Sequence, residues 1–147
     1  MKKALTILFI LFSFTQSFAA KGDIPSVLQG LKQTVNNVDY LAKVNITNVE
    51  ILFEDDESEK HVYFAQVLET YKGDDHKQIR YEMFVDQGEN VVFNSTPIYI
   101  ALCLDSNGSY YWPGTGSEFK YSLELDTWLT KNKSKLENTS ASAEWCK

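Results

Sequence analysis

The sequence is poor in residues that several common functions require. It has a single arginine, Arg80, and 20 acidic residues against 14 basic ones, for a net charge of −6. Nucleic-acid binding depends on clustered lysine and arginine, so this acidic chain is not expected to bind DNA or RNA. No apolar run reaches the roughly 18 residues of a membrane-spanning helix, so stable insertion into a membrane is not expected either.

Motifs for catalysis and metal binding are also scarce. The two histidines lie outside any motif such as G-x-S-x-G, in which a serine is paired with a base. Each histidine follows acidic residues in an expected turn, where solvated charge is the usual arrangement, so we assign no catalytic residue, metal site or cofactor. These groups are Asp55, Asp56, Glu57 and Glu59 before His61, and Asp74 and Asp75 before His76.

The first 19 residues have the pattern of a cleavable signal peptide. Two lysines follow the initial methionine, and an apolar run covers residues 4–14. Ser17 and Ala19 then supply the small side chains of a cleavage site. We therefore expect residues 1–19 to be removed and residues 20–147 to form one exported domain, either periplasmic or secreted. Removing the two lysines changes the net charge from −6 to −8.

Cysteine is limited to Cys103 and Cys146, both in the exported part. In an oxidising compartment an isolated pair of this kind indicates a disulfide. The alternative is a redox-active or metal-binding pair, but the C-x-x-C spacing that such sites favour is absent. We expect a structural disulfide that ties the C-terminal tail to the strand containing Cys103.

Alternating apolar and polar residues predict strands along most of the exported chain. Residues 79–85 alternate cleanly, and residues 61–71 are apolar on both sides and expected to be well buried. A hairpin with a type I′ turn is expected at Asn107-Gly108. The expected strands cover residues 40–53, 61–71, 79–85, 98–104 and 109–112.

The first expected strand changes its apolar phase in the middle. Tyr40 and Ile46 belong to one alternating series, whereas Val49 and Phe53 belong to a series shifted by one residue. A regular strand would turn one series away from the core. We expect a bulge or bend near Thr47 that lets Ile46 and Val49 both face inward.

Helices are expected at the two ends of the domain. Leu28 and Leu31 share one helical face near the N-terminus, and Leu125, Trp128 and Leu129 share one in a helix over residues 122–136. Five strands, a bent first strand and flanking helices predict a mainly β fold. The expected architecture is a five-stranded, OB-like Greek-key barrel with a short N-terminal helix and a C-terminal helix.

Three segments carry a resemblance to a known family: residues 63–74 (YFAQVLETYKGD), residues 97–102 (PIYIAL), and Tyr110-Tyr111 running into residues 114–117 (GTGS). The chain resembles netrin-like domains, the OB barrels of tissue inhibitors of metalloproteinases and their bacterial relatives. The resemblance covers residues 38–121. It implies the fold more than the activity, because the inhibitors chelate zinc through an N-terminal cysteine and no cysteine precedes Cys103 here.

An aromatic corner stands out near the end of the expected barrel. It consists of Tyr110, Tyr111 and Trp112 beside Gly114 and Gly116. Such residues are typical of contact surfaces, in which case Tyr110, Trp112 or both should be largely exposed. They are also typical of a barrel core, in which alternation would bury Tyr111 or its two neighbours. We take these five residues as candidate partner-binding residues.

These observations favour a non-enzymatic binding module with a protein partner, such as an inhibitor or an envelope accessory protein. The alternative is a small secreted hydrolase that uses two of the 20 acidic residues.

Overall fold

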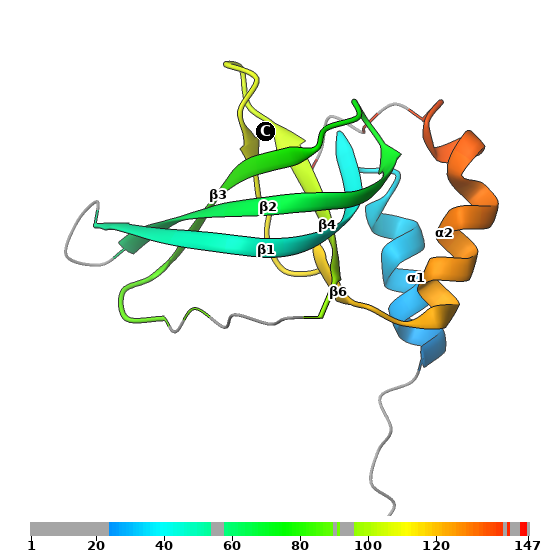
Figure 1. Cartoon of the computed structure of the whole chain (residues 1–147), viewed down its shortest axis with the longest axis horizontal. Helices are drawn as coiled ribbons and strands as arrows, with labels where there is room; N and C mark the ends of the chain where they lie inside the picture. Colours follow the sequence, from blue (N-terminus) through cyan, green and yellow to red (C-terminus); the bar gives the residue numbers. More distant parts are fainter. Residues whose placement is uncertain are drawn as a thin grey trace, which may run out of the picture.

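The computed structural model describes residues 24–53, 58–89, 91, 96–139, 141 and 145–146 (Figure 1). The expected signal peptide lies outside these residues, as do Asp55, Asp56 and Glu57. The element order is helix, six strands, helix. The bounds are α1 Ile24–Thr34, β1 Tyr40–Phe53, β2 Ser58–Lys72, β3 Gln78–Asp86, β4 Ile98–Leu104, β5 Tyr110–Tyr111, β6 Glu118–Lys120 and α2 Leu123–Leu136.

Five strands close into a barrel. β1 pairs with β2 along one edge and with β4 along the other, and β2 pairs with β3, all antiparallel. The short strand β5 completes the ring, because it runs parallel to β3 and antiparallel to β4. The structure confirms the mainly β, OB-like barrel with a helix at each end. A sixth strand, β6, pairs with β4 and was not expected.

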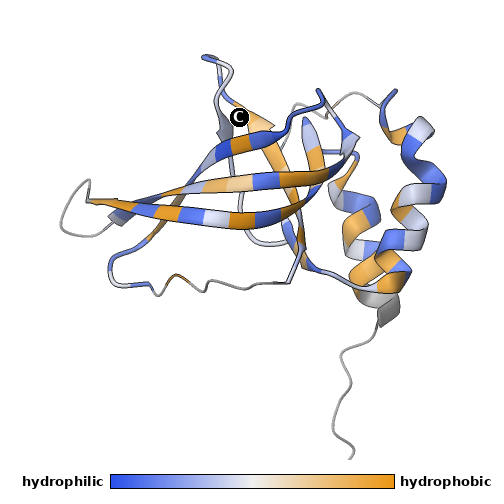
Figure 2. Ribbon diagram, in the orientation of Figure 1, coloured by the Kyte–Doolittle hydropathy of each residue, from blue (hydrophilic) through white to orange (hydrophobic). Residues whose placement is uncertain are grey.

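Two apolar clusters lie on opposite sides of the barrel wall. Successive residues of a strand point to opposite faces, so β4, which is apolar throughout, contributes to both clusters. Ile98, Ile100 and Leu102 fill the barrel interior, whereas Tyr99, Ala101 and Cys103 face the helices. Figure 2 shows β4 as an almost continuous apolar ribbon.

The helices form a layer against the outside of the barrel, side by side in Figure 1. Leu31 and Val35 of α1 and Leu125 and Leu129 of α2 are buried in the cluster between helices and strands. The Ser122 hydroxyl caps α2 by accepting a hydrogen bond from the amide of Leu125. Neither described helix is long and apolar enough to cross a membrane.

A buried lysine also fixes α1 to the barrel. Lys72, at the end of β2, is only 3% exposed and donates from Nζ to the carbonyl oxygen of Val35 at 2.8 Å. Val35 follows the last residue of α1, where the unpaired carbonyls of a helix attract positive charge. Burial lowers the pKa of the Lys72 ammonium.

The bulge expected in β1 is confirmed. Ile46 lies opposite Ala65 and Asn48 lies opposite Phe64, so Thr47 has no cross-strand partner. Val49 lies opposite Tyr63, two residues from Ala65, and Ile46 and Val49 therefore share a face. The Thr47 hydroxyl donates to the carbonyl of Phe64 at 3.0 Å, which holds the extra residue against β2.

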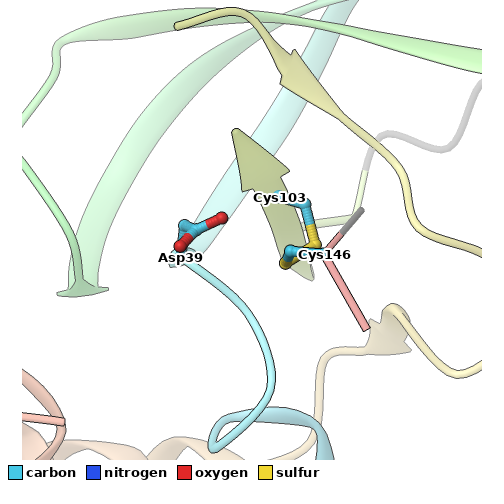
Figure 3. A group of neighbouring side chains, drawn as sticks. All are labelled: Asp39, Cys103 and Cys146. Atoms are coloured by element: carbon cyan, nitrogen blue, oxygen red, sulfur yellow. A yellow bond between two sulfur atoms is a disulfide. The ribbon is translucent and has the colours of Figure 1, made fainter. Parts of the chain in front are cut away.

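The expected disulfide is confirmed as well. Cys103 and Cys146 are bonded, with their Cα atoms 5.3 Å apart and 43 residues apart in sequence. Figure 3 shows the bond beside Asp39, whose carboxylate accepts a hydrogen bond from the amide of Leu104 at 2.8 Å.

The hairpin between β4 and β5 has a different turn from the expected type I′. Such a turn needs a positive φ at both central residues, but among the described residues every positive φ belongs to a glycine. Gly108 alone has the positive φ here, at 78°, and its amide donates to the carbonyl of Asp105. The Asp105 carboxylate accepts hydrogen bonds from the amides of Asn107 and Ser109 and stabilises this wider turn.

Candidate functional site

The barrel is closed by β5 beside one end of β4 and left open beside the other end, because β5 and β6 share one edge of β4. β5 lies beside Cys103 and Leu104 and joins β4 to β3, whereas β6 lies beside residues 98–100. β5 ends before Pro113, which has no amide hydrogen to continue the ladder. No pairing joins β3 to β6 among the described strands, so the wall is split between them.

A cleft of about 570 Å³ occupies this split, and we call it the β3–β6 cleft. Residues from five strands and from the segments around Thr96 and Thr115 form its walls. They are Ile46, Tyr63, Tyr81, Met83, Thr96, Ile98, Trp112, Thr115, Gly116, Glu118 and Lys120.

Two stacked tyrosines form one wall of the cleft. Tyr63 and Tyr81 lie opposite each other on β2 and β3, and their ring centroids are 5.0 Å apart with an angle of 9° between the planes. Burial raises the pKa of both hydroxyls, and the nearby carboxylate of Glu118 raises them further. The wall is therefore a neutral aromatic surface at physiological pH.

Trp112 adds an unused hydrogen-bond donor. Its backbone amide donates to the carbonyl of Glu82 at 2.8 Å, which fixes the residue at the end of β5. Its indole Nε1 is buried and has no hydrogen-bond partner among the described residues. A buried donor without an acceptor is costly and uncommon in native proteins.

Glu118 and Lys120 bring charge to the cleft. They lie opposite Ile100 and Ile98 on β4 and therefore share the interior face of the wall with these apolar residues. Glu118 is exposed as a residue, yet burial of its carboxyl raises its pKa, and Lys120 offsets part of that effect. The cleft thus combines apolar and aromatic walls with the charged groups of Glu118 and Lys120 and the hydroxyls of Thr96 and Thr115.

The structure separates the five residues of the aromatic corner. Trp112 and Gly116 line the cleft, whereas Gly114 is absent from its lining. Tyr111 packs on the helix side of the wall. Tyr110 points into the barrel beside Tyr40, and its hydroxyl lies 3.1 Å from Nε2 of His76. Burial raises the pKa of Tyr110 to about 12.

The large exposure that the contact-surface alternative predicted for Tyr110 or Trp112 is not found, and the alternation of the three aromatic residues follows the core alternative. Tyr110 and Trp112 are each only partly exposed, because alternation along β5 directs both toward the barrel interior. Their role in binding stays a prediction. Of the two, Trp112 alone contributes to the β3–β6 cleft.

Glu59 and His61 form a buried pair elsewhere on β2. Glu59 Oε2 lies 3.1 Å from His61 Nε2, and Glu59 Oε1 accepts a hydrogen bond from the amide of Gly88 at 3.0 Å. The hydrogen bond from Gly88 and, to a smaller extent, that with His61 lower the pKa of Glu59. His61 is 1% exposed, which leaves a substrate no access, so the pair stabilises the turn after β3.

A second polar group surrounds the disulfide. Asp39, Cys103 and Cys146 place an oxygen and two sulfur atoms within 4.8 Å of one another, the one group of this kind among the described residues (Figure 3). The two sulfur atoms are bonded to each other, so neither is a thiolate that could ligate a metal ion.

Several cleft residues were not singled out from the sequence. Tyr63 and Tyr81 become neighbours only through the pairing of β2 with β3, and Glu118 and Lys120 lie on a strand of three residues that follows a glycine-rich segment. The alternation of Glu118 and Lys120 around the apolar Phe119 was the available signal. No protein-family model and no curated protein matches this chain.

Proposed function

We propose that this chain is an exported, non-enzymatic module that binds a protein partner through the β3–β6 cleft. The observation that carries the proposal is the β3–β6 cleft itself, in which Tyr63, Tyr81 and Trp112 lie beside Glu118 and Lys120. Among the described residues, the buried indole N–H of Trp112 has no acceptor. A partner that supplies a carbonyl or carboxylate oxygen would satisfy this donor and cover the adjacent tyrosine wall.

The composition of the cleft supports binding over hydrolysis. Glu118 is the one acidic side chain among its lining residues, whereas glycoside hydrolysis usually takes two carboxyl groups at a set separation. Among the described residues, the closest histidine–carboxylate pair, His61 with Glu59, is buried outside this lining.

The disulfide supports the proposed compartment. Structural disulfides such as Cys103–Cys146 persist in the periplasm or outside the cell and are rare in the cytosol. The signal-peptide pattern of residues 1–19 agrees with such a location. The OB-like barrel is likewise compatible with the netrin-like relationship, which we retain as part of the proposal, without the zinc-chelating cysteine of the inhibitors.

Site-specific photo-cross-linking in cells of the native host tests this function. A photoreactive residue in place of Thr115, which is exposed at the cleft, should cross-link to a protein. The matched control replaces Ser134, exposed on α2, and should give no such product. Combining the Thr115 probe with Trp112→Phe should weaken the cross-link. A product that forms equally at both positions, or that is insensitive to Trp112→Phe, contradicts the proposal.

A further inference from the structure

In the part of the chain that the structure describes, no strand pairs with the edge of β6 that faces away from β4. The amide of Ala101 donates to the carbonyl of Ser117 at 2.8 Å, and the register continues as Ile100 opposite Glu118 and Tyr99 opposite Phe119. In an antiparallel ladder alternate residues direct their backbone groups to the partner. Ser117 and Phe119 therefore bond to β4, whereas Glu118 and Lys120 direct an N–H and a C=O each into the split of the barrel.

The outward backbone groups of Glu118 and Lys120 have no strand beside them in the part of the chain that the structure describes. β6 pairs with β4 alone, and none of the backbone hydrogen bonds between elements uses these groups. An edge of this kind is a template for another extended chain. Two residues supply up to four hydrogen bonds to such a chain.

Hollows flank this edge on both of its faces. The β3–β6 cleft lies on the interior side, and a groove of about 540 Å³ lies on the helix side. Val27 and Tyr121, which are 42% and 43% exposed, help to form this groove together with Phe119 and Leu125. Glu118 and Lys120 border both hollows. A chain added to β6 would thus place successive side chains in alternate hollows.

We infer that the partner binds as an extended peptide strand that pairs with β6 and fills the split between β3 and β6. This inference rests on the proposed function and specifies its partner. Backbone hydrogen bonds to Glu118 and Lys120 would give affinity, and the two hollows would select two adjacent apolar side chains, one for each face. The net charge of −8 expected for residues 20–147 favours basic residues around that apolar pair.

A second copy of this chain fits the edge less well. Pairing of β6 with its symmetry mate would bring a second Glu118 and Lys120 against the cleft wall that contains Ile46 and Ile98. The cleft would then hold two copies of this charged pair, whereas apolar side chains would gain by burial against Ile46 and Ile98. A peptide with its own apolar residues makes that gain.

The test first selects peptides of about seven residues that bind the oxidised domain from a random display library. The selected sequences are then prepared as capped synthetic peptides. The inference expects selected peptides to carry two adjacent apolar residues with basic neighbours. N-methylation along the best peptide should then weaken binding with a period of two residues, by roughly tenfold at each amide that faces β6. A library that yields no binder, or an N-methyl scan without this period, overturns the inference.

Variants of Lys120 give a matched test on the protein side. Lys120→Pro removes the amide that points away from β4 and leaves the hydrogen bonds to β4 in place. Proline is tolerated at a free strand edge for this reason. Lys120→Ala removes only the charged side chain. We expect peptide binding to be roughly tenfold weaker for Lys120→Pro than for Lys120→Ala, because both variants lose the charged side chain and the proline alone also lacks the outward amide. If Lys120→Pro does not fold, the N-methyl scan decides alone.

The outcomes also separate this inference from the proposed function. A cellular cross-link at Thr115 that depends on Trp112 but not on the Lys120 amide would retain the binding function and overturn strand addition. A dimer of the wild-type domain that Lys120→Pro dissociates would assign the edge to a second copy and overturn the peptide. If the wild-type protein gives no cross-link at Thr115 and binds no peptide, both proposals are rejected.

Discussion

Lys43 on β1 and Asp126 on α2 form an ion pair, with Nζ 2.7 Å from Oδ1. The hydroxyl of Tyr99 donates to the same oxygen at 2.9 Å. The hydrogen bond from Lys43 and, to a smaller extent, that from Tyr99 lower the pKa of Asp126. One partly buried carboxylate therefore connects the helix layer to two strands of the barrel.

Asp126→Asn tests this connection through its pH dependence. Because the folded-state pKa is lowered, the stabilisation is fully present above the unfolded pKa of about 3.9 and is lost as the pH falls through the lower folded value. We expect the variant to lose about 2 kcal/mol at pH 7, in the range of charged hydrogen bonds, and to approach the wild type in acid. Urea unfolding at several pH values measures both. Glu50→Gln, at an exposed position on β1, is the control, and an Asp126→Asn deficit that is constant with pH would contradict the prediction.

Gly73→Ala should destabilise the fold more than the same change at another glycine with a similar backbone. Gly73 has φ of 86°, and a Cβ there would lie 2.8 Å from Cδ2 of Tyr40 and 3.0 Å from the carbonyl oxygen of Asp39. Gly88 has φ of 82° with open space around it. Gly88→Ala should therefore cost about 1 kcal/mol from backbone strain alone, and Gly73→Ala clearly more. Thermal unfolding of both variants measures this, and equal losses would mean that the contact with Tyr40 relaxes freely.

Loss of the disulfide should lower stability without changing the fold. The bond closes a loop of 43 residues, which corresponds to about 4 kcal/mol in the chain-entropy treatment. The double variant Cys103→Ser, Cys146→Ser is expected to lose a few kcal/mol in denaturant unfolding. In wild-type protein isolated from its host, peptide mapping without reductant should recover the two cysteines as one linked pair. Two free, alkylatable thiols would contradict this.

Trp112 should respond differently to two substitutions. Trp112→Phe keeps an aromatic ring and removes a buried N–H that has no acceptor among the described residues. The free energy of unfolding should therefore not fall, while partner binding should weaken by roughly tenfold. Trp112→Ala also removes contacts with the barrel interior and should lose stability, by less than the 3–5 kcal/mol of a fully buried tryptophan, because Trp112 is partly exposed. Calorimetry of both variants, with binding measured in parallel, distinguishes the roles. Unchanged binding with a large loss of stability in both would make Trp112 a core residue only.

The exported protein should begin at Ala20. Cleavage after Ala19 follows from the small residues Ser17 and Ala19. Intact-mass measurement of protein recovered from the envelope or the medium determines the first residue. A mass that includes Met1 would reject the signal peptide, and replacing Ala19 by a bulky residue should block processing.

The long strands were predictable from the sequence because their burial has a simple period. Clean alternation marks β3, and the phase shift between Ile46 and Val49 in β1 indicated a bulge before any pairing was known. The C-terminal helix followed from Leu125, Trp128 and Leu129 on one face and begins within one residue of its expected start. In each case the local order of apolar and polar residues predicts which side chains are buried.

The site was less predictable because non-local pairing creates it. β6 has three residues, too few to show a period, and it forms only because β4 offers an edge beside residues 98–100. The parallel pairing of β5 with β3 is equally invisible in the local sequence, yet it decides where the wall closes and where it opens. From the sequence alone Lys72 is expected in a polar turn. Its burial depends on the hydrogen bond to the carbonyl of Val35, 37 residues away.

The bulge makes the position of Thr47 open to loss as well as to substitution. Thr47 is exposed, so another side chain there would remove only the hydrogen bond to Phe64. Deleting the residue would place Ile46 and Val49 two residues apart in a regular strand, opposite Ala65 and Tyr63, and would keep both on the same face. Deleting a paired residue such as Val44 would instead turn the residues on one side of it to the other face, so the length of β1 can vary at the bulge but not within its paired positions.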